Sequence, residues 1–530
     1  LDALVIGAGF AGLYQLLCLR DRLGLSVKAL EAGGGVGGTW YWNRYPGARC
    51  DIESMEYSYG FDEELQQEWE WTERYAPQPE IEQYANHVAD RYDLRKDITF
   101  NTKVTAATFD EASSSWTVTT DGGESVTAQF VVMATGCLSS ANFPQIEGME
   151  SFEGETFHTG RWPKEGVEFA GKRVAVIGTG SSAIQSIPII AEECDDLTVF
   201  QRTANYAVPA WNGPLDPEYV KGTKASYNEF RDLNRTMPAA FGSRLPAGTG
   251  QNVGDFTDDE VREVLEARWN YGGLGFLGGF VDTILNPQAN EVVAEFVREK
   301  IRAIVTDPDV AALLSPDTVI GCKRLCVDTG YFDTFNKDHV HLVDIRKSPI
   351  SRITAKGVQT VDEEYDVDII VFATGFDAMT GALLSVDIKG RDGLSLRDAW
   401  AAGPRTYLGL NVVGFPNLFT ITGPGSPSVL TNMMVSIQQH VDWIGACIHH
   451  LRDNNIATIE AQQQAQDEWV EFVNMMANLT LFPSCNSWYL GANVPGKTRV
   501  FMPLLGFPTY EEKCDQVVAN NYEGFALASA

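Results

Sequence analysis

Hydrophobic residues follow two different spacings along the chain. Compact apolar runs that end in a glycine turn, at 1–9, 130–136, 172–180 and 368–377, predict buried strands. Apolar residues three or four positions apart, at 13–23, 257–269 and 291–305, predict amphipathic helices. Because the strands and helices alternate, the pattern indicates an α/β chain.

The helical spacing dominates residues 210–318. Thr257 and Glu260 form a predicted capping box at the start of one helix. The apolar face of that helix is predicted to contain Val261, Val264, Leu265 and Trp269. The next predicted helix, 291–305, has an apolar stripe of Val293, Phe296, Val297, Ile301, Ile304 and Val305. We therefore expect a helical insertion over this range.

The first apolar run leads into the pattern Gly7-x-Gly9-x-x-Gly12 and then into a leucine-rich helix. Glycines at this spacing allow a tight turn, close approach of a pyrophosphate and close packing of helix on strand, and the helix N-terminus offers free N–H groups. The next predicted strand, 26–32, ends at Glu31, about 20 residues further on, where a carboxylate suits a ribose hydroxyl. These features together predict a dinucleotide site.

A second copy of the glycine loop occurs at 172–185, with Gly178, Gly180 and Ala183 in the corresponding places. The strand that follows, 197–203, ends in Arg202 instead of a carboxylate, and an arginine there suits the 2′-phosphate of NADPH. A solvated cation at a strand end is the alternative for Arg202. The other residues predicted to contact this cofactor from the loop and its helix are Thr179, Ser181, Ser182 and Gln185.

Two nucleotide sites with different preferences predict two cofactors. FAD suits the first site and NADPH the second, so that hydride passes from nicotinamide to flavin. The runs at 130–136 and 368–377 each end in Thr-Gly, as expected where the chain crosses between two flavoprotein domains. A buried strand followed by a glycine turn describes both runs equally well.

Composition narrows the possible partners. The chain has 530 residues, 44% of them hydrophobic, and a net charge of −31, which predicts two to four globular domains and no attraction to nucleic acid. Because no apolar run approaches the ~20 residues that span a bilayer, we expect no membrane segment. We expect a soluble monomer.

Nine scattered cysteines, an odd number, indicate reduced thiols in a cytoplasmic protein rather than a disulfide framework. Cys322 and Cys326 are predicted to be buried apolar residues, and no metal site is predicted. The chain opens at Leu1 on a predicted strand without the features of a signal peptide, and we expect a few residues before it. A flavin-dependent disulfide reductase needs two nearby cysteines after the first loop, and the spacing of Cys18 and Cys50 excludes that function.

Two long motifs carry a resemblance to a known family. Residues 152–163 contain Phe152, Gly154, His158, Trp162 and Pro163 at the spacing of its fingerprint, and residues 37–51 supply Gly38, Trp40, Tyr45, Pro46, Gly47 and Asp51. The chain thereby resembles the type I Baeyer–Villiger monooxygenases. The similarity extends over essentially the whole chain, through 321–336, 373–383, 423–443 and 487–497.

The resemblance implies oxidation of a ketone to an ester or lactone by NADPH and O2, through a flavin C4a-peroxide. It implies that Arg324 keeps this peroxide deprotonated and that Asp51 orients the arginine. Guanidinium suits the role because it stays charged. The alternative for the pair is an ordinary salt bridge.

The resemblance also assigns the remaining site residues. Gly38 and Trp40 contact cofactor, while Lys323, Thr203 and Arg202 contact NADP. Trp488 lies on a mobile loop that closes over the nicotinamide. The alternative interpretation is that Trp488 is an ordinary aromatic residue of a surface cluster. The fingerprint lies on the linker between the nucleotide domains, where His158 couples domain positions and Trp162 anchors the linker by burial. The residues expected to line the substrate pocket are Ser428, Val429, Leu430 and Met433.

The implied architecture is two Rossmann-like domains with an insertion. The FAD-binding domain spans 1–140 and 377–530, the NADP-binding domain spans 141–209 and 319–376, and the helical insertion spans 210–318. Two other functions stay open: oxidation of sulfur or nitrogen by the same cofactors, with sulfoxidation also expected as a side activity, and a redox-sensing flavoprotein without turnover. Ketone-dependent oxidation of NADPH separates the last from an enzyme.

Overall fold

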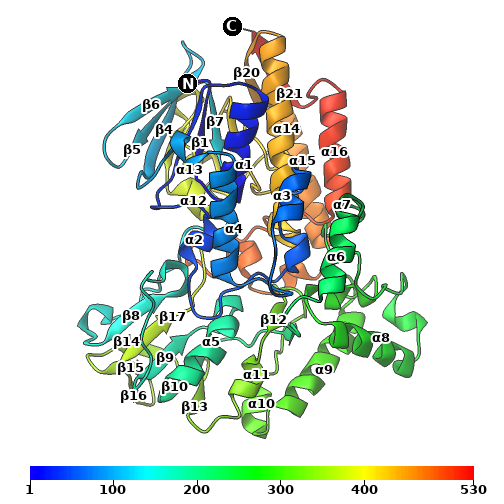
Figure 1. The fold of residues 1–530 in the computed structure, drawn as a ribbon. Helices are drawn as coiled ribbons and strands as arrows, with labels where there is room; N and C mark the ends of the chain where they lie inside the picture. Colours follow the sequence, from blue (N-terminus) through cyan, green and yellow to red (C-terminus); the bar gives the residue numbers. More distant parts are fainter. Residues whose placement is uncertain (530) are drawn as a thin grey trace.

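Two five-stranded sheets organise the chain, one in the upper and one in the lower lobe of Figure 1. The structure is a computed structural model that describes residues 1–529. All strand pairs within both sheets are parallel. Parallel sheets are covered on both faces, which explains why their strands consist of continuous apolar runs. The lobes together confirm the predicted α/β class.

The upper sheet has the strand order β19-β7-β1-β2-β3. Helix α1 follows β1 through the first glycine loop and packs against α14, the longest helix. The bounds of these elements are β1 Ala3–Ile6, β2 Val27–Leu30, β3 Ile98–Thr99, β7 Phe130–Met133, β19 Leu418–Thr420, α1 Phe10–Leu17 and α14 Met433–Asp453. A strand near residue 420 thus completes a sheet that begins at residue 3.

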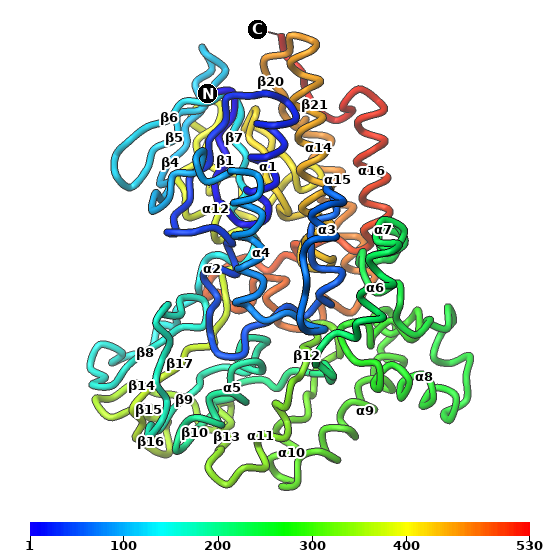
Figure 2. Tube along the Cα trace, in the orientation of Figure 1, coloured from blue at the N-terminus to red at the C-terminus, as the bar shows by residue number. Residues whose placement is uncertain are grey.

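Segments near the two ends of the chain share the upper lobe. In Figure 2 the blue and the orange-to-red segments run side by side there, and both termini lie at its top. The contact of α1 with α14 and the bond from Arg452 to Asp2 agree with this arrangement. The other elements of this part are α2 Thr39–Trp42, α3 Glu63–Glu68, α4 Gln78–Arg91, α15 Gln463–Asn478, α16 Phe507–Ala519, β20 Ile456–Ala461 and β21 Phe525–Ser529.

The lower sheet has the order β13-β10-β9-β17-β8. Helix α5 follows β9 through the second glycine loop, so the strand, turn and helix repeat the arrangement of the upper lobe. The bounds are β8 Glu155–His158, β9 Arg173–Ile177, β10 Asp196–Gln201, β13 Val340–Asp344, β17 Ile369–Phe372 and α5 Ser181–Glu193. The predicted strands at 130–136 and 368–377 are thus confirmed as β7 and β17.

Helices occupy most of the segment between β11 and β12, which forms the green part of Figure 1. The predicted capping box at Thr257 and Glu260 is confirmed at the start of α8, whose apolar face buries Val261, Leu265 and Trp269. The stripe on α9 is also buried at Val293, Phe296, Val297 and Ile301. The helices and their flanking strands are α6 Pro217–Ala225, α7 Tyr227–Arg235, α8 Asp258–Tyr271, α9 Pro287–Ile304, α10 Pro308–Leu314, β11 Ala207–Pro209 and β12 Cys326–Asp328.

Short strands and helices complete the two lobes. A four-stranded sheet β18-β4-β5-β6 belongs to the upper lobe and a three-stranded sheet β14-β15-β16 to the lower. Their bounds, with the remaining helices, are β4 Val104–Asp110, β5 Ser115–Thr120, β6 Ser125–Ala128, β18 Asp387–Lys389, β14 Ile350–Ile353, β15 Gly357–Thr360, β16 Glu364–Asp366, α11 Tyr331–Thr334, α12 Gly381–Leu384 and α13 Leu396–Ala399. Among the helices of residues 1–529, none is long and apolar enough to cross a membrane.

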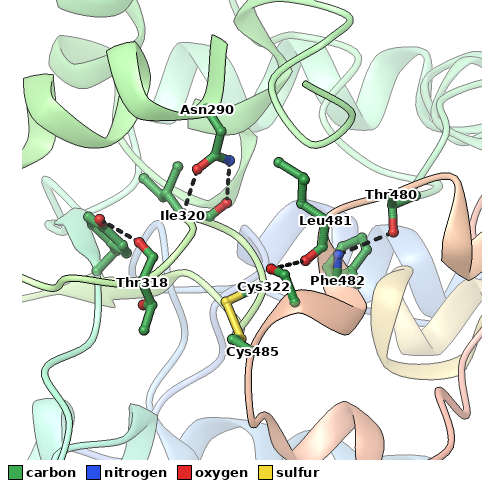
Figure 3. Close-up of a disulfide and its surroundings, with 10 residues drawn as sticks. Asn290, Thr318, Ile320, Cys322, Thr480, Leu481, Phe482 and Cys485 are labelled. Carbon is green, nitrogen blue, oxygen red and sulfur yellow. Dashed lines mark hydrogen bonds between the residues drawn. A yellow bond between two sulfur atoms is a disulfide. The ribbon is translucent and has the colours of Figure 1, made fainter. Parts of the chain in front are cut away.

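Cys322 is buried, as expected, but the expectation that it is a reduced thiol is wrong. Cys322 forms a disulfide with Cys485, 163 residues further along the chain, and the two Cα atoms are 6.1 Å apart (Figure 3). The other seven cysteines, including Cys326, are free and buried. Spacing along the sequence does not reveal such a pair, because the fold brings the two residues together.

Candidate active site

A continuous cavity of about 850 Å³ is lined by residues of both glycine loops. Almost every residue predicted to bind cofactor or to act in catalysis contributes to its wall, including Glu31, Asp51, Arg202 and Arg324. The exception is Gly12, which lies behind the first loop. The cavity thus brings together segments that lie more than 400 residues apart in sequence, from Gly7 to Trp488.

The first glycine loop is shaped for close approach. A Cβ on Gly12 would lie 1.9 Å from the carbonyl oxygen of Gly7, so only glycine lets α1 pack this tightly on the turn. No side chain among residues 1–529 caps the N-terminus of α1. Its first N–H groups therefore remain available to a pyrophosphate, as an FAD site requires.

Glu31 stands at the end of β2 and is 5% exposed. Its two carboxylate oxygens accept hydrogen bonds from the backbone N–H groups of Ala8 at 2.7 Å and Gly33 at 2.6 Å. Burial raises the pKa of Glu31, and these two bonds oppose that effect. Each oxygen retains a lone pair toward the cavity, so the position suits the predicted contact with a ribose hydroxyl.

The second loop presents an open surface to the cavity. A Cβ on Gly180 would meet no described atom within 4 Å, and the N-terminus of α5 likewise has no side-chain cap among residues 1–529. Thr179 donates to the carbonyl oxygen of Thr203 at 2.9 Å, and Asn205 donates to that of Thr179 at 2.6 Å. These bonds fix the loop to the end of β10, beside Arg202, and its donors fit a second pyrophosphate.

Arg202 and Lys323 form a positively charged part of the wall. Burial lowers the pKa of Lys323, and the neighbouring charge of Arg202 lowers it further. Neither cation forms a salt bridge within residues 1–529, and Asp317, whose charge opposes the effect, is paired with Arg346 at 3.1 Å. A phosphate placed between them relieves the repulsion, which is the chemistry of a 2′-phosphate site.

Arg324 and Asp51 meet in a bidentate ion pair at the cavity wall. The Nε of Arg324 donates to Oδ2 of Asp51 at 2.6 Å, and Nη2 donates to Oδ1 at 2.9 Å. The exposed fractions of the two side chains are only 20% and 24%. Burial tends to lower the pKa of Arg324, but the Asp51 carboxylate outweighs it, so the pKa lies above its ordinary value and the charge is permanent.

A second partner of Arg324 comes from the predicted substrate segment. The carbonyl oxygen of Val429 accepts from Nη1 of Arg324 at 2.6 Å. Val429 and Met433 also line the cavity, whereas Ser428 is fully buried and donates to the sulfur of Met379. Leu430 packs in the same apolar cluster without reaching the wall. The contact of Ser428 and Leu430 with substrate stays a prediction.

The fingerprint is only in part a linker, because 155–158 form β8 at the edge of the lower sheet. His158 is 2% exposed, and its Nδ1 accepts from the N–H of Gly160 at 2.9 Å, so Nε2 carries the proton. That Nε2–H donates to Thr374 Oγ1 at 3.1 Å, and Thr374 donates to the carbonyl of Asn142 at 2.6 Å. Burial lowers the pKa of His158 to about 4. A neutral, fully bonded imidazole suits a structural role.

The rest of the fingerprint packs around this histidine. Trp162 is buried against Phe157 and Phe169. A Cβ on Gly154 would collide with the carbonyl oxygen of Asp368, and a Cβ on Gly160 would collide with the ring of Phe376. Phe152 contacts the apolar cluster of the lower sheet. None of the five fingerprint residues lines the cavity, and Pro163 directly follows Trp162.

Gln185 bridges the two lobes. Tyr45 donates to its Oε1 at 2.8 Å, and its Nε2 donates to the carbonyl of Arg49 at 3.0 Å. Its amide is thus engaged by the chain, and a contact with cofactor stays a prediction. Gly38 and Trp40 lie at the cavity wall, where the indole N–H of Trp40 donates to Tyr57 at 3.0 Å.

The predicted loop residue Trp488 lines the cavity on a short turn, 488–490. Sequence reasoning missed its neighbour Tyr489, which is buried in the same apolar cluster as Val429, and it missed the role of the Val429 carbonyl. Because every residue has a backbone carbonyl, the sequence does not indicate that this one accepts a hydrogen bond from Arg324. Tyr489 had one signal, because it adjoins a residue already assigned to the site.

Several proteins of known activity match the chain from end to end. An acetone monooxygenase (methyl acetate-forming) of Gordonia is 43% identical over 100% of this chain and 99% of its own. A Baeyer-Villiger monooxygenase of Pseudooceanicola batsensis is 41% identical over 98% and 95%. A phenazine N-monooxygenase of Lysobacter antibioticus is 40% identical over 100% and 97%. A family profile described as pyridine nucleotide-disulphide oxidoreductase matches residues 4–220.

Solved structures agree with these relatives. A steroid monooxygenase bound to NADP is 51% identical, with a TM-score of 0.95, covering 100% of this chain and 99% of that chain. The complex of OTEMO with FAD and NADP is 43% identical, with a TM-score of 0.95 and the same coverage. Both cofactors predicted from the two glycine loops thus occur in structures of the same fold.

Proposed function

The chain belongs to the Baeyer–Villiger monooxygenase family, and we propose from this premise that it oxidises ketones to esters or lactones. The overall reaction consumes one ketone, NADPH, H⁺ and O2 and gives one ester, NADP⁺ and water. The observation that carries the proposal is the permanent positive charge of Arg324, fixed by Asp51 in a cavity that contains both glycine loops.

FAD, when bound, supplies the activation of oxygen with electrons taken from NADPH. The chain binds the pyrophosphate at the uncapped N-terminus of α1 and the ribose at Glu31. Gly38 and Trp40 add to the wall of this part of the cavity. Since the loop and Glu31 are built on strand ends, they hold the cofactor on rigid elements.

Arg324 stabilises negative charge that develops in the cavity. Asp51 engages two N–H groups on one side of the guanidinium and Val429 a third, so its orientation is set before substrate arrives. A preorganised cation in a site that excludes water contributes more than a mobile one. Arginine suits this position better than lysine, because it does not lose its proton there.

Arg202 and Lys323 hold the 2′-phosphate of NADPH, and the second glycine loop with α5 holds its pyrophosphate. Thr203 contributes through its backbone link to Thr179. This assignment follows the position of uncompensated positive charge. It predicts a preference for NADPH over NADH.

The ketone occupies the part of the cavity beside Arg324. Val429 and Met433 supply apolar wall there, and Trp488 closes the loop over the nicotinamide. We also propose the division of the chain into an FAD-binding domain (1–140 and 377–530), an NADP-binding domain (141–209 and 319–376) and a helical insertion (210–318). His158 couples the two nucleotide domains indirectly: its partner Thr374 donates to the carbonyl of Asn142, and the side chain of Asn142 donates to the carbonyl of Asn493 in the FAD-binding domain at 2.8 Å.

A panel of linear, aryl, small cyclic and large cyclic ketones tests the proposal and identifies the substrate class. With FAD and NADPH in air, a substrate should raise NADPH consumption and yield a product heavier by one oxygen atom, identified by mass spectrometry as the ester or lactone. The same protein without ketone is the control. NADPH consumption that no ketone raises, or that yields only hydrogen peroxide, contradicts the proposal.

Oxidation of nitrogen or sulfur is the second candidate, and the similarity to a phenazine N-monooxygenase favours keeping it. The same ketone panel with an added alkyl aryl sulfide and a tertiary or aromatic amine separates the two. We expect the ester to be the main product and a sulfoxide to form as a side product. An N-oxide or sulfoxide formed much faster than any ester supports the second candidate instead.

A further inference from the structure

A buried histidine that sequence reasoning did not single out lies directly behind the cavity wall. His440 stands on α14, and its side chain is fully buried. Its Nδ1 accepts a hydrogen bond from the backbone N–H of Thr422 at 2.9 Å, so Nε2 carries the ring proton. Thr422 lines the cavity, whereas His440 does not. One hydrogen bond therefore connects the interior histidine to the wall.

The other ring nitrogen of His440 is bonded to a second buried residue. Nε2–H donates to Oη of Tyr510 on α16 at 2.7 Å, and the phenol of Tyr510 donates to the carbonyl of Leu408 at 2.6 Å. Burial lowers the pKa of His440 to about 3, so the imidazole is neutral at physiological pH. Each donor in this chain of bonds has an acceptor, and the tautomer of His440 is thereby fixed.

Both ends of this chain of bonds are backbone groups of residues in a rare conformation. The φ angle of Thr422 is 54° and that of Leu408 is 60°, in the left-handed region that residues other than glycine seldom adopt. The region is especially unfavourable for a β-branched residue such as threonine, and it persists only where the surroundings hold it. The hydroxyl of Thr422 bonds locally, to the carbonyl of Ile421 at 2.7 Å. The bond to His440 is the link from Thr422 to α14.

Thr422 belongs to the part of the cavity that we assign to FAD. It follows β19, which pairs with β7, and β7 pairs with β1, the strand that leads into the first glycine loop. The N–H of Ile421 donates to the carbonyl of Met133 at the end of β7, at 3.2 Å. Thr422 and the glycine loop thus lie at the same carboxyl edge of one parallel sheet, where such sheets bind their ligands.

We propose that His440 is a positioning residue for FAD binding, because it holds Thr422 in the left-handed conformation that shapes this part of the wall. Tyr510 supports His440 by accepting from Nε2–H, which keeps Nδ1 free to accept from Thr422. The proposal rests on the proposed function, since it takes FAD to occupy the upper lobe. It adds a residue that acts on the cofactor through the backbone of another.

The first test uses two substitutions that each preserve one of the two bonds of His440. In His440→Asn the amide oxygen stands near the place of Nδ1 and still accepts from Thr422, whereas in His440→Gln the amide NH2 stands near Nε2 and still donates to Tyr510. Dilution of the holoenzyme, followed by the fluorescence of released flavin, gives the dissociation constant of FAD. It should rise about two- to tenfold in His440→Gln, as for the loss of one hydrogen bond, and stay nearly unchanged in His440→Asn.

A role of His440 in packing alone predicts a different result. Both substitutions replace the ring by a smaller amide, so packing predicts the same change in both variants. With excess FAD, the visible circular dichroism of the bound flavin should differ from that of the unmodified protein in His440→Gln and match it in His440→Asn. Equal dissociation constants in the two variants overturn the proposal.

The second test asks whether glycine at position 422 makes His440 dispensable. Glycine adopts a positive φ readily, so Thr422→Gly needs no support for this conformation. In that background, His440→Gln should raise the dissociation constant of FAD by a smaller factor than in the unmodified protein. The matched control is Asn455→Gly, an exposed residue with a φ of 53° in the turn before β20. The same factor in the Thr422→Gly and control backgrounds contradicts the proposed role.

Tyr510→Phe carries the test where the variants of His440 do not fold. It keeps the buried ring and removes only the oxygen that accepts from Nε2–H, so Nδ1 is protonated more often and accepts from Thr422 less often. We expect a rise in the dissociation constant of FAD, and an unchanged value overturns the proposal. An unmodified protein that binds no FAD contradicts the proposed function instead, so the two failures are distinguishable.

Discussion

At the scale of single residues, charge that lacks a partner marks function more clearly than charge that has one. Arg324 is paired with Asp51 and Val429, and a salt bridge of this kind is the usual fate of such residues. Arg324 differs from the arginines in surface salt bridges because it lies on the wall of the cavity that both glycine loops line. Arg202 and Lys323 instead repel each other, and this repulsion indicates an anion between them.

Replacement of Arg202 by alanine should therefore weaken the binding of NADPH but not that of NADH. A charge-assisted contact contributes ~1.5–3 kcal/mol, so we expect KM for NADPH to rise about tenfold or more. KM for NADH, which lacks the 2′-phosphate, should change little. Steady-state kinetics with both coenzymes give the measurement, and Arg352→Ala, exposed on β14, is the control. A parallel rise for the two coenzymes would exclude a phosphate contact at Arg202.

At the scale of elements, both glycine loops were predictable from sequence because their function depends on the backbone. Gly7 and Gly9, with their counterparts Gly178 and Gly180, occupy the predicted turn between strand and helix, and Gly12 lies in the first turn of α1. Yet two of these glycines, at different places in the pattern, have opposite surroundings. A Cβ would collide at Gly12 and would stand in open space at Gly180.

Alanine substitutions at these two positions should separate folding from binding. Gly12→Ala should destabilise the upper lobe and abolish FAD binding, because α1 has to move away from the turn. Gly180→Ala should fold normally, with a φ of −82° that alanine accepts, and should raise KM for NADPH by placing a methyl group in the cavity. Melting temperature and flavin content test the first variant, and kinetics test the second. A stable, yellow Gly12→Ala protein would be the contrary result.

Elements also show where sequence reasoning reached its limit. The fingerprint was predicted to be a linker, but 155–158 pair with β17, because strand pairing depends on a partner more than 200 residues away. The disulfide of Cys322 with Cys485 was missed for the same reason. The helices α8 and α9 were predictable, since their apolar faces and the cap at Thr257 are local signals. Long-range partners leave no comparable signal in one sequence.

At the scale of the whole molecule, the active site exists only where the lobes meet. The cavity takes its wall from both glycine loops, and Gln185 donates across the lobes to the carbonyl of Arg49. His158 takes part indirectly, because Asn142, which accepts from its partner Thr374, donates to the carbonyl of Asn493. The family resemblance made it possible to predict which residues belong to the site. Their relative positions in space could be described only from the folded structure. Coupling between the lobes therefore has a measurable signature at His158.

The neutral state of His158 should make stability depend on pH. Its pKa falls from an ordinary 6.5 to about 4 on burial, so its contribution is present above pH 6.5 and is lost as pH falls from 6.5 toward 4. The unmodified protein should exceed His158→Gln in free energy of unfolding at pH 7.5 by a margin that shrinks at pH 5. Urea unfolding at both values measures it, with exposed His449→Gln as the control. A margin independent of pH would refute the neutral imidazole.

The central claim is that Arg324 acts after the flavin has been reduced, and one variant tests it most directly. In Arg324→Ala, FAD binding and anaerobic reduction by NADPH should persist, because the first glycine loop and Glu31 are untouched. Ester formation in air should nearly vanish, since loss of preorganised charge is typically worth ~3–4 kcal/mol. Stopped-flow reduction followed by product analysis measures both halves on one sample. Retained reduction without ester is the predicted result, and ester formed at the unmodified rate would contradict the account.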